Sequence, residues 1–75
     1  MEVEKISDYQ IKVLYKGEVF KATKIADIWS INRYRASSNE YYIIAAVQSE
    51  KAIVNTIKKY MEELKEIQKR LKGGK

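Results

Sequence analysis

The sequence predicts a mainly β domain that ends in a single long α-helix. Hydrophobic residues recur at every second position in the first part of the chain, which is the period of a half-buried strand. In the last third they recur every three to four positions, which is the period of an amphipathic helix. Because the chain has only 75 residues, we expect one domain with a small core. We expect this domain at residues 9–72, after a polar lead-in at 1–8 and before a frayed tail at 73–75.

A β-hairpin is the first predicted element. Ile11, Val13 and Tyr15 occupy alternate positions, and Lys16–Gly17 follows them at a natural turn. The glycine can supply the positive φ angle that tight hairpin turns require. The second arm of the hairpin is expected over residues 18–22.

Two further strands are expected after the hairpin. The short apolar run Tyr41–Val47 is rich in aromatic and β-branched residues, which favours a strand. The polar residues 37–40 before it form a turn. The segment 28–36 is compatible with two structures: a strand that pairs with Tyr41–Val47, or a helix that Thr23 caps. Its pattern favours the strand.

The C-terminal helix is predicted over residues 49–72. Ser49 is a good N-cap, and Gly73–Gly74 ends the helix. One continuous apolar stripe runs along it, with spacings of four, three, four, three and four: Ile53, Ile57, Tyr60, Leu64, Ile67 and Leu71. This spacing suits a contact between two helices as well as an intramolecular core.

The predicted helix is long for such a small sheet. It would measure roughly 35 Å at about 1.5 Å per residue, so its second half extends past the elements that it can cover. Three explanations fit: the helix bends around the core, the whole stripe is intramolecular core, or a second subunit supplies the partner surface. The last explanation makes Tyr60, Leu64, Ile67 and Leu71 the candidate oligomer interface.

The composition argues against most catalytic and metal-binding chemistry. The chain has no cysteine and no histidine, so thiol nucleophiles, the commonest general base and the commonest metal ligands are absent. Glu62, Glu63 and Glu66 lie among lysines, as in a solvated helix face. We therefore expect no enzyme, no cofactor and no metal site. No apolar run is long enough to span a membrane and no signal peptide is visible, so we expect a cytoplasmic protein.

Four segments resemble one known family of DNA-binding proteins. They are Tyr15–Glu18, Thr23–Trp29, Ala46–Val47 and Ser49–Lys51, and they occur in the family's order before a terminal helix. The family is that of the seven-kilodalton chromatin proteins of thermoacidophilic archaea, and the resemblance covers roughly residues 9–64. It implies an SH3-like barrel, in which a two-stranded hairpin packs on a three-stranded sheet and the C-terminal helix closes the barrel.

The resemblance also implies a duplex DNA interface. In that family the outer face of the three-stranded sheet lies on the minor groove, where apolar side chains wedge between base pairs. It places Ile31 and Tyr34 at the wedge positions, with Arg33 and Arg35 beside them to offset phosphate charge. The implied DNA-binding residues are Trp29, Ile31, Arg33, Tyr34, Arg35, Ile44 and Ala46.

The chain also departs from the family pattern. Ile44 stands where the family has an arginine, and the chain has fewer lysines than the family. A net charge of +5 still permits an anionic partner. We therefore expect a protein of the nucleoid whose DNA binding is weaker and less salt-dependent than the family's.

Other partners are compatible with the same apolar face. Contiguous exposed apolar surface usually marks an interaction site. The alternative function is therefore a homo-oligomeric interaction module with weak or absent DNA binding, associating through the sheet face, the long helix or both. RNA is a third candidate, because Trp29, Tyr34, Tyr41 and Tyr42 on a sheet could stack unpaired bases. In a further interpretation, these aromatic residues are core of a different fold.

Overall fold

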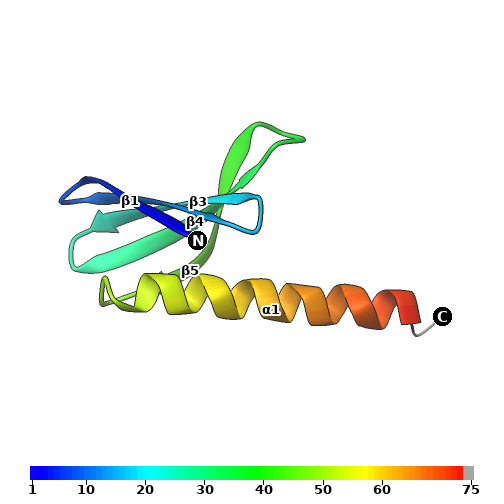
Figure 1. The fold of residues 1–75 in the computed structure, drawn as a ribbon. Helices are drawn as coiled ribbons and strands as arrows, with labels where there is room; N and C mark the ends of the chain where they lie inside the picture. Colours follow the sequence, from blue (N-terminus) through cyan, green and yellow to red (C-terminus); the bar gives the residue numbers. More distant parts are fainter. Residues whose placement is uncertain (74–75) are drawn as a thin grey trace.

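The computed structural model describes residues 1–73, which form one antiparallel sheet and one helix (Figure 1). The elements are β1 (Glu2–Ser7), β2 (Gln10–Tyr15), β3 (Glu18–Ile25), β4 (Ile28–Arg35), β5 (Glu40–Val47) and α1 (Ala52–Gly73). The mainly β fold class with a C-terminal helix is confirmed. The predicted tail lies outside the described residues except for Gly73. No helix in the described part of the chain is both long and apolar enough to cross a membrane.

Short turns connect the strands into a meander of order β1-β2-β3-β4-β5. Lys16 and Gly17 both have positive φ angles, of 51° and 78°, as a type I′ turn requires. The predicted first hairpin is therefore confirmed. The segment 28–36 is a strand up to Arg35, as its pattern favoured. Ala26, in the turn between β3 and β4, also has a positive φ angle, of 56°.

The first residues of the chain belong to the sheet, so the predicted polar lead-in at 1–8 is wrong. Strand β1 pairs with β2, and Val3 lies directly opposite Val13. All six residues of β1 are exposed, which is why their composition resembles that of a solvated segment. A charged edge strand is a common protection against pairing with a further chain.

The sheet is open, and the expected barrel closure is not found. Strand β3 pairs with β2 on one side and with β4 on the other. The hairpin and the three-stranded sheet that were expected to pack on each other are therefore parts of one sheet. Strands β1 and β5 are its edges. In place of a second layer of strands, α1 covers one face of the sheet (Figure 1).

The core lies between the sheet and the first half of α1. All its buried side chains are apolar: Ile11, Val13, Phe20, Ala22, Trp29, Ile31, Ile53 and Ile57. Every second residue of a strand points to the same face, so β2, β3 and β4 each contribute alternate residues. Fully burying one large apolar side chain stabilises the fold by about 1.5–3 kcal/mol. These contacts determine which face of the sheet the helix covers.

The helix begins at Ala52 rather than at the predicted residue 49. Ser49 nevertheless caps the turn that leads into it. The backbone nitrogen of Ala52 donates to the carbonyl oxygen of Ser49 at 3.1 Å and to its Oγ at 3.3 Å. Ser49 thus caps the backbone as predicted, but one turn separates it from the first residue of the helix.

The second half of α1 projects beyond the sheet (Figure 1). We call residues 64–71 the overhang. Along the stripe, Tyr60 and Leu64 are half-buried, whereas Ile67 is 52% and Leu71 76% exposed. The helix does not bend back over the core and the stripe is not all core, so two of the three explanations for its length are wrong.

Candidate nucleic-acid interface

The strand register divides the sheet into a helix-covered face and an open face. Residues directly opposite each other in an antiparallel pair point to the same face. Phe20 lies opposite Arg33 and is buried beneath α1, so this row belongs to the helix-covered face. Lys21 lies opposite Asn32, one residue along each strand. This second row belongs to the other side of the sheet, which we call the open face.

Two of the predicted DNA-binding residues are part of the core. Trp29 is 3% exposed and Ile31 is fully buried, and both belong to the cluster that includes Ile53 and Ile57 of α1. Their predicted place against a DNA groove is therefore wrong. The physical reason is that α1 covers the face on which they lie, and large apolar side chains are more stable buried than exposed.

Arg33 connects the sheet to the helix at the margin of the covered face. Its Nη2 lies 3.1 Å from Oε1 of Glu18, and its Nη1 donates to the hydroxyl of Tyr60 at 3.1 Å. Partial burial lowers the pKa of the guanidinium, but the hydrogen bonds to Tyr60 and Glu18 and the charge of Glu18 outweigh it and raise the pKa. The guanidinium is thus held by the fold, on the face opposite to that of Tyr34.

Arg35 and Ile44 also lie away from the open face. Arg35 is exposed on the side of the sheet that α1 occupies, with its guanidinium carbon 4.5 Å from the centre of the Tyr42 ring. Ile44 is the extra residue of a β-bulge in β5, and it packs half-buried against the core. Neither side chain can share an interface with Tyr34 on the open face.

Two tyrosines on the helix-covered side have shifted acidities. The hydroxyl oxygens of Tyr42 and Tyr60 are 3.5 Å apart. The hydrogen bond from Tyr60 stabilises the phenolate of Tyr42 and lowers the pKa of Tyr42. Burial raises the pKa of Tyr60, and its hydrogen bond to Tyr42 acts in the same direction. These groups join β5 to α1 and do not form part of the open face.

Tyr34 and Ala46 are the predicted residues that lie on the open face. Tyr34 is directly opposite Tyr41, and their ring centres are 5.2 Å apart. The hydroxyl of Tyr34 donates to Oδ1 of Asn39 in the turn between β4 and β5. Ala46 is exposed, and its small side chain leaves the backbone of β5 accessible to a ligand.

Sequence reasoning missed two lysines on the open face. Lys12 and Lys21 lie directly opposite each other on β2 and β3, and neither makes an ion pair with a described residue. Like charges directly opposite on a sheet repel each other, so an anion bound between them relieves that repulsion. The Nζ atom of Lys21 is 5.6 Å from the centre of the Tyr41 ring. The lysine pair therefore adjoins the tyrosine pair.

The sequence did contain a signal for Lys12. It alternates with the apolar residues Ile11 and Val13, and this alternation indicates that Lys12 faces away from the core.

Carboxylates lie mostly away from this surface. The described strands β2 to β5 place none on the open face, since Glu18 and Glu40 point to the side that α1 occupies. Glu2 and Glu4 do lie on it, but at the β1 edge, where Glu4 is opposite Lys12. The open face is therefore positive at its centre and negative along one edge, and an anion is best placed toward β4 and β5.

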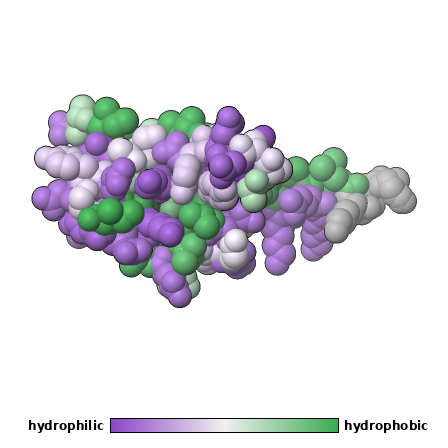
Figure 2. Space-filling view, turned by 90° about the horizontal axis from the view of Figure 1, so that it is seen from above, coloured by the Kyte–Doolittle hydropathy of each residue, from purple (hydrophilic) through white to green (hydrophobic). Residues whose placement is uncertain are grey.

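Apolar side chains interleave with the polar ones on the open face. Figure 2, which looks onto the side away from α1, shows separate hydrophobic patches among hydrophilic surface. Ile43, opposite Asn32, is 61% exposed. A sheet face that combines cations, aromatic rings and apolar groups can contact both the phosphates and the bases of a nucleic acid.

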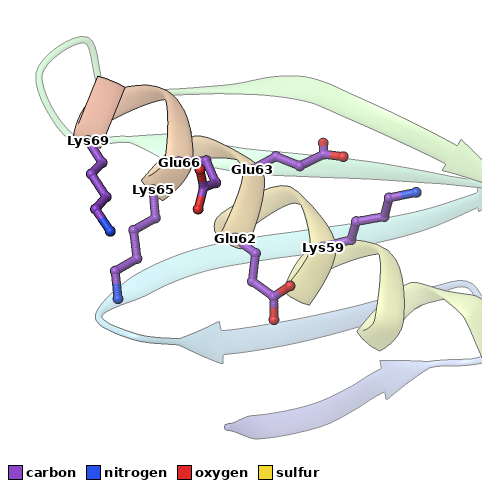
Figure 3. Close-up of a pocket in the computed structure, with 6 residues that line it drawn as sticks. All are labelled: Lys59, Glu62, Glu63, Lys65, Glu66 and Lys69. Atoms are coloured by element: carbon purple, nitrogen blue, oxygen red, sulfur yellow. The ribbon is translucent and has the colours of Figure 1, made fainter. Parts of the chain in front are cut away.

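The outward side of α1 has a charged hollow without the character of a binding site. Figure 3 shows the six side chains that line it, which are Lys59, Glu62, Glu63, Lys65, Glu66 and Lys69. They point in different directions, and their opposite charges balance. No group of metal-ligating residues in the described part of the chain could hold a metal ion. The hollow is best described as the solvated face of the helix.

Comparison with protein-family models, with curated proteins and with solved structures finds no match for this chain. Its function is therefore inferred from its own residues and from the geometry of the open face.

Proposed function

We propose that this chain binds duplex DNA with the open face of its sheet, without sequence preference and without catalysis. One observation carries the proposal. The Lys12–Lys21 row, which makes no ion pair with a described residue, adjoins the pair of half-buried Tyr34 and exposed Tyr41 on a face where β2 to β5 place no carboxylate. On this proposal the chain is a divergent relative of the archaeal chromatin proteins that it resembles. It has five strands and a C-terminal helix, as they do, but its strands form one open sheet, and it acts in the nucleoid.

The lysines supply the electrostatic part of this binding. Lys12 and Lys21 are held side by side by the register of β2 and β3, so they present a fixed double positive charge to the sugar–phosphate backbone. A lysine that neutralises a phosphate releases a condensed counterion from DNA, and this release favours binding at low salt. Because there are only two such contacts, we expect the affinity for DNA to be weak and to fall as salt rises.

The tyrosines supply the contact with the groove. Figure 1 shows the tip of the β4–β5 hairpin rising on the side of the sheet away from α1. Tyr34 and Tyr41 lie near this tip, next to Lys21, so they reach the bases of a duplex whose backbone rests on the lysine row. Tyr34 keeps the wedge position that the resemblance gave it, and Tyr41 takes the role of its partner. The buried Trp29 and Ile31 support this platform from beneath.

Replacement of the tyrosine pair tests the proposal. We expect Tyr34→Ala/Tyr41→Ala to weaken binding to a fluorescently labelled duplex at least tenfold in an anisotropy titration at low salt. The matched control is Tyr9→Ala, which removes an exposed tyrosine from the turn between β1 and β2. Its affinity should equal that of the parent, and circular dichroism should show that all three proteins are folded.

The outcomes of this titration are distinct. No binding of the parent at low salt would refute the function, and equal affinities for the folded double variant and the control would refute the assigned face. A competition between the duplex and single-stranded RNA of equal length is also needed. If RNA displaces the duplex at lower concentration, the open face is a stacking platform for unpaired bases instead.

A further inference from the structure

The overhang is an apolar surface that this chain does not cover. It continues the stripe that packs Ile53 and Ile57 into the core, but Ile67 and Leu71 lie past the end of the sheet. Hydrophobic surface is visible on the part of α1 that projects beyond the sheet (Figure 2). The stripe keeps its alternating spacing of three and four residues in this part, which is the pattern by which one helix packs against another.

We infer that a second copy of this chain covers the overhang as an antiparallel helix. Placing Leu64 opposite Ile67 of the second copy gives a two-fold symmetric pair. The stripe then forms four layers, two of Leu64 with Ile67 and two of Tyr60 with Leu71. Each half-buried residue near the sheet, Tyr60 or Leu64, therefore meets an exposed one, Leu71 or Ile67, and the exposed side chains of both copies become buried.

The charges that flank the stripe fit this arrangement. Glu63, Glu66 and Arg70 line a hollow around Ile67, and Glu63 and Arg70 lie two turns apart on the same flank of the helix. In the antiparallel register each Glu63 lies near Arg70 of the second copy. The dimer therefore has two ion pairs that are related by its symmetry. Flanking charges of this kind set partner choice and orientation in helix pairs.

A parallel pair is disfavoured by charge. It would bring the cationic C-terminal ends of both helices together, with Arg70 of one copy at the level of Arg70 of the other. It would also place the two sheets side by side at one end. The antiparallel pair separates the sheets and distributes the charge.

The junction of the sheet and α1 can accept the end of the second helix. A hollow of about 210 Å³ lies there, with Met61 and Leu64 on one side and Lys16 and Glu18 on the other. Leu71 of the second copy approaches this hollow when it packs on Tyr60. The open face is on the other side of the sheet, so pairing of the helices leaves it accessible. The dimer therefore has two accessible open faces.

The contact is small, so the association is expected to be weak. It involves about three turns of each helix and buries less than the roughly 1,200 Å² of a standard stable interface. We therefore expect a dissociation constant on the order of 10–100 µM. Sedimentation equilibrium of the full chain across that concentration range should show a reversible monomer–dimer equilibrium.

Charge exchange tests the register. Glu63→Arg and Arg70→Glu should each weaken the dimer at least tenfold, because each puts like charges together. The double variant Glu63→Arg/Arg70→Glu should restore it. Ile67→Glu should abolish the dimer, whereas Ile25→Glu, at another exposed position, on the sheet, should leave it unchanged.

The measurements also define how the inference fails. A monomeric parent throughout the range would overturn it. Dimerisation lost in Ile25→Glu but kept in Ile67→Glu would place the interface on the sheet. A dimer that Ile67→Glu abolishes but the charge variants do not affect would overturn the antiparallel register. These results do not depend on DNA, so they are separable from a failure of the proposed function.

Discussion

Removal of the two open-face lysines should change how DNA binding responds to salt. Lys12→Gln/Lys21→Gln takes away both cations of the central row and leaves the strands intact. Each neutralised phosphate contributes about −0.9 to the slope of log K against log salt. Two lost contacts should therefore make the slope shallower by about 1.8. Between about 50 and 200 mM salt, the parent should lose about 12-fold more affinity than the double variant.

Fluorescence anisotropy of a labelled duplex at several salt concentrations measures this slope. The matched control is Lys58→Gln/Lys59→Gln, which removes two exposed lysines from α1 and the same formal charge from the protein. The control should keep the slope of the parent. If both double variants flatten the slope equally, binding follows net charge alone and the assignment of the open face is wrong.

Four further substitutions test the fold around the site. Ala26→Gly should raise the free energy of unfolding by about 0.5–1 kcal/mol in chemical denaturation, because glycine adopts a positive φ angle without the Cβ clash; Ala46→Gly, in a strand, should lower it. Ile57→Ala should lower it by about 2–5 kcal/mol, since this side chain is fully buried, and a loss below about 1 kcal/mol would show that α1 does not seal the covered face. Tyr60→Phe should raise the pKa of Tyr42 toward its ordinary value, because the hydrogen bond from Tyr60 is the main cause of the lowered pKa. Phenolate absorbance in an alkaline titration measures this change, and an unchanged onset would contradict it.

Local patterns in the sequence predicted most of the elements. The Lys16–Gly17 turn and the alternation before it depend on nearest neighbours, and the structure has that hairpin. The long helix followed from one uninterrupted stripe, and its unpartnered second half followed from length alone. These features need no knowledge of which elements pack together.

The faces of the sheet could not be predicted in the same way. Alternation shows that Trp29 and Ile31 share a face, but not which face the helix covers. That choice depends on how Ile53 and Ile57 pack in three dimensions. The exposed strand β1 was also missed, because its stabilising contacts are hydrogen bonds to β2 and leave no apolar pattern.

Only part of the candidate site could be predicted, because the sequence does not show which face of the sheet the helix covers. Tyr34 and Ala46 lie on the open face, while Arg33 is held by Glu18 on the other side. The opposition of Lys12 and Lys21 is a product of the register between two strands. Two residues that are nine apart in the chain can be recognised as neighbours only when the turn between them is known. The resemblance could not indicate this lysine pair either, because the family has a different set of lysines.

The most direct test uses two of the three asparagine side chains, Asn32 on the open face and Asn55 on α1, because they lie on opposite surfaces. Side-chain amide resonances of the ¹⁵N-labelled protein can be followed while duplex DNA is added at low salt. We expect the Asn32 amide to shift progressively and saturate, while the Asn55 amide and the indole of the buried Trp29 stay in place. Shifts at Asn55 or Trp29 with none at Asn32 would contradict binding on the open face.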